Sequence, residues 1–106
     1  MTQAQPIVQI QAELAARIFA IGARTSLDTA GTIATEIDMI RRIARDNGLY
    51  PAAAVAQALE AALGRGERGP LIDGWLAILR DAVRCERNDP AACETFAAAC
   101  SVRLMA

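Results

Sequence analysis

Large apolar side chains recur at every third or fourth position along most of this chain, and this spacing constrains the fold more than any other feature. An α-helix brings residues three and four apart onto one face, whereas a half-buried strand needs strict alternation of apolar and polar residues. No stretch of the chain alternates in this way. The pattern therefore predicts an all-α protein.

Two helices are predicted in the N-terminal half. The first begins at Pro6 and ends at Gly22, because proline is favoured in a first turn and glycine after a last one. Its large apolar residues share one face: Ile7, Ile10, Leu14, Ile18 and Ile21. The second begins near Thr25, where a threonine oxygen and Asp28 suit a helix start, and ends at Gly48. Its apolar stripe has the spacing of helices that pack at a shallow angle: Ala30, Ile33, Ile37, Ile40 and Ala44.

Three further helices are predicted in the C-terminal half. The segment that follows Tyr50-Pro51 and ends in Gly64 is short and alanine-rich, so it is stable only if it packs against others. The segment that opens at Pro70 is apolar over more than half of its circumference, as expected of the most buried helix. A break at 87–90 precedes a fifth helix with one apolar face: Cys93, Phe96, Ala97, Cys100 and Leu104. We expect a single domain over residues 1–106, a compact bundle of four to five helices with the fourth central.

The chain contains no histidine and no lysine, so all eleven of its basic residues are arginine. Histidine and lysine are the side chains most often used for general base catalysis, Schiff bases and imidazole ligation of metals. A phosphorelay transfer domain, which needs a histidine, is excluded. The composition leaves an enzyme open but disfavours it, and we expect no metal and no other cofactor.

The charges are balanced, with eleven arginines against twelve carboxylates and a formal net charge of -1. Such a surface has no uniform field to recruit nucleic acid or an anionic membrane. No apolar run approaches the roughly 20 residues that cross a bilayer, and the first residues lack a secretion-signal pattern. We expect a soluble cytoplasmic protein that binds neither nucleic acid nor membrane. Its use of arginine and alanine is typical of a GC-rich bacterial genome.

Two groups of arginines lie within predicted helices: Arg41, Arg42 and Arg45 in the second, and Arg80, Arg84 and Arg87 at the end of the fourth. Both groups are interleaved with carboxylates, as in Asp38 and Asp81. Opposite charges three or four residues apart pair on a helix surface. Solvated intrahelical ion pairs are therefore expected at both places.

Hydrophobic residues make up 54% of the chain, and adding glycine takes the apolar share above the typical range of about 45 to 50%. The 24 alanines account for part of this excess, because alanine costs little on an exposed helix face. Our first hypothesis is a non-enzymatic interaction module that forms a homodimer or binds another protein. The candidate contact residues are the second-helix stripe and the face around the tryptophan: Ala30, Ile33, Ile37, Ile40, Ala44 and Trp75. The other interpretation is that they are core.

The loop 64–69, GRGERG, has the glycine spacing of a dinucleotide-binding loop. The residues before it are strong helix formers where that site requires a strand, which excludes a Rossmann fold. Glycine N–H groups, two arginines and the start of the next helix could still hold a phosphate or carboxylate. The second hypothesis is a regulatory binder of an anionic metabolite at Arg65, Gly66, Arg68 and Gly69. The alternative is an ordinary solvated connection.

The three cysteines, Cys85, Cys93 and Cys100, carry the remaining distinctive chemistry. A hairpin about the break at 87–90 would place Cys85 across from Cys93, whereas Cys93 and Cys100 lie about 10 Å apart along one helix. A helix start and nearby arginines favour the thiolate of Cys93. The third hypothesis is a thiol redox protein that uses Cys85 and Cys93, and the alternative is that these thiols fill the core. The chain has no pair of cysteines at C-x-x-C spacing, so the cysteine pattern does not suggest a zinc site.

Overall fold

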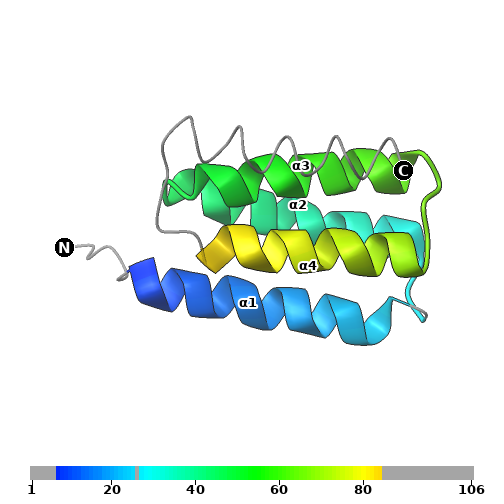
Figure 1. The fold of residues 1–106 in the computed structure, drawn as a ribbon, viewed down its shortest axis with the longest axis horizontal. Helices are drawn as coiled ribbons and strands as arrows, with labels where there is room; N and C mark the ends of the chain where they lie inside the picture. Colours follow the sequence, from blue (N-terminus) through cyan, green and yellow to red (C-terminus); the bar gives the residue numbers. More distant parts are fainter. Residues whose placement is uncertain (1–6, 26, 85–106) are drawn as a thin grey trace.

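The computed structural model describes residues 7–25 and 27–84, which form four α-helices (Figure 1). The helices are α1 (Ile7–Arg24), α2 (Ala30–Asp46), α3 (Tyr50–Gly64) and α4 (Pro70–Arg84). Consecutive helices run in opposite directions, and no strand occurs in these described ranges. The prediction of an all-α fold is confirmed. The predicted fifth helix lies outside the described residues.

The four helices close a ring around one shared core. α1 contacts α2 and α4, and α3 contacts the same two helices. In Figure 1, α4 lies between α1 and α3. It supplies Trp75, the largest fully buried side chain, as expected of a central helix. The alanine-rich α3 has seven buried residues against six in α4, so its packing stabilises it as predicted and it shares the central place with α4.

The apolar stripes predicted for the first two helices form one side of this core. α1 buries Ile10, Leu14, Ile18 and Ile21, and α2 buries Ile33, Ile37, Ile40 and Ala44. Ile7, at the start of the α1 stripe, is 44% exposed. No polar or charged side chain is buried in the described part of the chain. Apolar burial therefore provides the main stabilisation of the bundle.

Two predicted helix boundaries are wrong by up to a turn. α1 continues through Gly22 to Arg24, because Gly22 keeps a helical backbone and does not adopt the left-handed φ that ends a helix. α2 begins after Thr29, whose hydroxyl oxygen accepts the Thr32 N–H at 3.2 Å. The hydroxyl of Thr25 instead donates to the Gly22 carbonyl at the end of α1.

The predicted stop at the end of α2 is confirmed and has a defined geometry. Gly48 has a φ of 76°, in the left-handed region that a residue without a Cβ adopts easily. The Leu49 N–H donates to the Ala44 carbonyl at 2.8 Å, and the Gly48 N–H donates to the Arg45 carbonyl at 3.2 Å. These are the two hydrogen bonds of a Schellman turn, which also buries Leu49 completely.

One side chain ties the first helix to the last turn of the fourth. The Gln11 amide donates from Nε2 to the Val83 carbonyl at 2.9 Å. Carbonyls in a last helical turn have no partner within the helix, so this hydrogen bond satisfies one of them. None of the four described helices combines the length and the hydrophobicity needed to cross a membrane.

Replacing a core residue of α2 should destabilise the folded monomer. Ile37 is fully buried, so we expect Ile37→Ala to lower the free energy of unfolding by about 2 to 5 kcal/mol, because it leaves a cavity. Met39 lies on the same helix and is 43% exposed, and Met39→Ala should change the free energy by less than about 1 kcal/mol. Urea denaturation followed by circular dichroism measures both. Equal effects at the two positions would contradict the burial of the α2 stripe.

Candidate functional site

The apolar stripe of α2, one of the two candidate contact surfaces, lies in the core of the chain itself. Ile33, Ile37, Ile40, Ala44 and Trp75 are at most 2% exposed. Ala30, at the start of α2, is half-buried. The other helices of the same chain already cover these side chains. They therefore belong to the core, which is the second interpretation that the sequence allowed. A contact surface has to be sought on the outside of the bundle.

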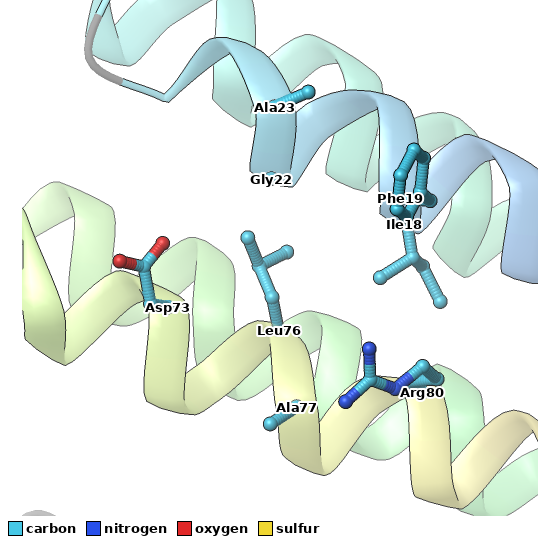
Figure 2. Close-up of a pocket in the computed structure, with 8 residues that line it drawn as sticks. All are labelled: Ile18, Phe19, Gly22, Ala23, Asp73, Leu76, Ala77 and Arg80. Atoms are coloured by element: carbon cyan, nitrogen blue, oxygen red, sulfur yellow. The ribbon is translucent and has the colours of Figure 1, made fainter.

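A groove between α1 and α4 is the clearest candidate on that outer surface (Figure 2). Its volume is about 350 Å³. We call its lining residues the α1–α4 edge: Ile18, Phe19, Gly22 and Ala23 of α1, with Asp73, Leu76, Ala77 and Arg80 of α4. Phe19 is 75% exposed, which is unusual for a side chain of this size. Phe19 was not among the contact residues predicted from the sequence, because it lies outside the core stripe of α1.

The two ends of the groove differ in size and charge. Figure 2 shows Phe19 and Arg80 at one end, while Ala23 and Asp73 lie at the other. Leu76 points from α4 toward Gly22 in the middle. Beyond this point only small side chains and one carboxylate line the groove. The α1–α4 edge thus carries a large aromatic group beside a shallow apolar recess.

The arginines of α2 are paired with carboxylates of the same helix. Arg41 and Arg42 pair with Asp38, and Arg45 pairs with Asp46, which confirms the ion pairs predicted for the second helix.

On α4 none of the predicted pairs is formed between residues that the structure describes. Within the described residues, neither Asp73 nor Arg80 forms an ion pair, and neither Arg80 nor Arg84 pairs with Asp81. Arg87 lies outside the described residues. The α1–α4 edge therefore presents one acid and one base, about two helical turns apart, that have no ion-pair partner within the described part of the chain.

The glycines of the loop 64–69 end one helix and connect it to the next. Gly66 has a φ of 86°, and its N–H donates to the Leu63 carbonyl at 3.0 Å. The Glu67 N–H donates to the Ala62 carbonyl at 3.1 Å, which completes a second Schellman turn. The glycine spacing that resembled a phosphate loop is thus explained by backbone geometry at the end of α3.

Glu67 organises the two arginines of this loop. Its Oε2 accepts a hydrogen bond from Arg65 at 2.7 Å, and its Oε1 accepts one from the indole Nε1 of Trp75 at 3.1 Å. Arg68 donates to the Glu67 backbone carbonyl at 2.8 Å. Because the guanidinium groups of Arg65 and Arg68 already have acceptors, a bound anion would have to compete with them.

The cavity next to the loop also disfavours an anion. It has a volume of about 370 Å³, and its lining includes two carboxylates beside Arg68. The lining residues are Thr25, Asp28, Arg68, Gly69, Pro70 and Asp73. Carboxylates repel an anionic ligand. No observation here favours the anion-binding hypothesis.

An ion-pair network joins α2 to α3. Arg41 contacts Asp38 on its own helix and Glu60 Oε1 on α3, the latter at 3.4 Å. The hydrogen bond from Arg41 holds the pKa of Asp38 below its ordinary value. Burial raises the pKa of Glu60 against the attraction of Arg41, and the neighbouring negative charge of Asp38 adds to the rise. The three side chains are about a quarter to a third exposed, so this network links two helices at the surface.

Metal and thiol chemistry find no support in the described part of the chain. It holds no group of three histidine, cysteine, aspartate or glutamate side chains that could bind a metal ion. Cys85 and Cys93, on which the redox hypothesis rests, lie outside the described residues, as does Cys100.

Comparison with known proteins gives no match, either to a family model, to a curated protein or to a solved structure. The class of the protein therefore follows from its own architecture. The described part of the chain is an antiparallel four-helix bundle with an apolar groove along one edge.

Two glycines at the end of α3 should respond to alanine in opposite directions. Gly66→Ala places a Cβ in the left-handed region and should cost about 1 to 2 kcal/mol of stability. Gly64 is helical and has no atom within 4 Å of an added Cβ, so Gly64→Ala should stabilise by up to about 1 kcal/mol. The measurement is the urea midpoint of each variant. A loss of stability at both positions would argue against the turn described here.

The network between α2 and α3 should show two opposite pH dependences. The lowered pKa of Asp38 contributes stability above the unfolded-state pKa, and this contribution is lost as the pH falls through the folded-state pKa. The raised pKa of Glu60 has the opposite sign, because its ionised form is disfavoured in the folded protein and costs stability as the pH rises through the folded-state pKa.

At neutral pH, Asp38→Asn should therefore lower the urea midpoint, whereas Glu60→Gln should leave it unchanged or raise it. Both differences from the wild type should shrink in acid, where the wild-type carboxyl groups are themselves protonated. Urea midpoints measured from neutral to acidic pH test this. A larger loss for Glu60→Gln than for Asp38→Asn would show that the attraction between Arg41 and Glu60 outweighs the burial of Glu60.

Proposed function

We propose that this protein is a non-enzymatic interaction module that binds another protein chain through the α1–α4 edge. The observation that supports this function is Phe19, three-quarters exposed beside an apolar groove. Burying such a side chain fully is worth roughly 2 kcal/mol. Aromatic side chains that enter a pocket of a partner often supply much of the binding energy of an interface.

Leu27 and Val8 are also large apolar side chains that are mostly exposed in the described chain. Neither of them lines the groove. Single exposed apolar residues are normal on a protein surface, whereas an exposed aromatic next to an apolar recess is the pattern of an interaction site. This distinction favours the α1–α4 edge over the other exposed apolar positions.

The polar groups of the groove support binding more than catalysis. Its lining includes one carboxylate, Asp73, and one guanidinium, Arg80, at opposite ends. A guanidinium keeps its proton in proteins and is a poor general base. Separated charges of opposite sign are instead suited to orienting a partner. The expected cytoplasmic location is part of this proposal.

Photo-cross-linking from two exposed aromatic positions tests the proposal in cells. A p-benzoylphenylalanine at position 19 should give a discrete adduct of one mass, because this side chain would lie inside the interface. The matched control is the same group at position 50, since Tyr50 is 52% exposed and does not line the groove. We expect no adduct of that mass from position 50.

A second variant shows whether the adduct depends on the groove. Ala77 lines the groove and is half-buried, so Ala77→Trp should fill the recess and abolish the adduct from position 19. An adduct that forms equally from both aromatic positions, or that survives Ala77→Trp, would contradict an interface at the α1–α4 edge. The absence of any adduct from position 19 would contradict the proposed function itself.

A further inference from the structure

We infer that the chain bound at the α1–α4 edge is a second copy of this protein, related to the first by a two-fold axis. This inference rests on the proposed function and names its partner. In the arrangement we infer, α4 packs antiparallel on the partner's α4, and the last turns of α1 meet the last turns of the partner's α1. The axis crosses the edge in the middle of the groove, between Gly22 and Leu76.

The shape of the edge fits a copy of itself. In a two-fold interface the same patch lies on both sides, so each protruding group needs a recess on the other side of the axis. Phe19 lies at one end of the groove, and Ala23 and Asp73 line the recess beyond its middle. Reversing the direction of the partner brings its aromatic ring onto this recess, at both ends of the interface.

The positions of the charges fit the same two-fold axis. Asp73 and Arg80 are seven residues apart on α4 and lie on opposite sides of Leu76 and Ala77. The same reversal that brings the aromatic ring onto the recess places Asp73 of each chain opposite Arg80 of the other. One axis therefore satisfies both the shape and the charge requirement. Neither charge has an ion-pair partner within the described part of its own chain.

The axis also crosses α4 at its middle. Leu76 and Ala77 are the central residues of α4, so two antiparallel copies overlap along nearly the whole of this helix, about 22 Å. Gly22 is close to the end of α1, so the two copies of α1 meet only over their last turns. The contact is therefore centred on α4, with the last turns of α1 beside it.

The oligomeric state of the full chain, measured by analytical ultracentrifugation over a range of concentrations, tests the inference. We expect a monomer–dimer equilibrium for the wild type. Phe19→Ser, Arg80→Asp and Asp73→Arg should each raise the dissociation constant by about tenfold or more, because they remove the aromatic contact or place like charges opposite each other. The urea midpoint of each variant, taken below its dissociation constant, should stay near that of the wild-type monomer, since all three side chains are exposed.

Mixing the two charge reversals separates this geometry from any other dimer. Each reversal alone places like charges at both ends of the interface. In a mixed dimer, the new acid at position 80 faces the new base at position 73 of the other chain, while the native Asp73 and Arg80 face each other at the opposite end. The mixture should therefore dimerise while each variant alone does not. The double variant Asp73→Arg, Arg80→Asp should also recover the dimer.

The matched control is Asp81→Arg, which reverses an exposed charge of α4 that does not line the groove. It should leave the dissociation constant unchanged. A wild type that is monomeric at all concentrations overturns the second copy as partner, as does a cross-linked adduct from position 19 whose mass is not that of two chains. In that last case the interaction function itself stands. A dimer that resists all three edge variants, or a mixture that shows no recovery, overturns the two-fold geometry.

Discussion

The burial of Trp75 constrains the structure more than any other single interaction. Its indole N–H must find an acceptor once the ring is fully covered, because an unsatisfied buried donor costs about 1 to 3 kcal/mol. Glu67 supplies this acceptor, and it can do so only because the turn at Gly66 ends α3 and brings residue 67 back toward α4. The geometry of a surface loop is thereby coupled to the centre of the core.

Much of the fold could be predicted because it depends on local periodicity. The burial of Ile33, Ile37 and Ile40 follows from their spacing, and the stop at Gly48 follows from the need for a left-handed residue after a helix. The extension of α1 past Gly22 could not be predicted in this way, since Gly22 keeps a helical backbone although glycine often follows the last turn of a helix. A glycine that ends a helix and one that lies inside a helix look alike in the sequence until the backbone is known.

The candidate site was harder to predict than the fold for a related physical reason. Periodicity identifies the residues that a chain buries within itself, and those are the residues that cannot contact a partner. The α2 stripe illustrates this, since the features that made it a candidate interface also made it core. Phe19 gave a weaker signal, as a large aromatic residue outside the stripe of its own helix. The significance of its place became clear only when α4 supplied the other wall of the groove.

Charged side chains pair within the chain on α2, whereas Asp73 and Arg80 of α4 have no ion-pair partner among the described residues. On α2 the arginines are paired within the chain, and such exposed pairs contribute little to stability. Asp73 and Arg80 would contribute equally little if they were paired in the same way. Kept apart on either side of a two-fold axis, they disfavour other registers of the same apolar surface, because a shifted or parallel partner would bring like charges together. Apolar contact at Phe19 would then supply affinity. The two charges would select one arrangement among the several that a groove lined by small apolar side chains allows.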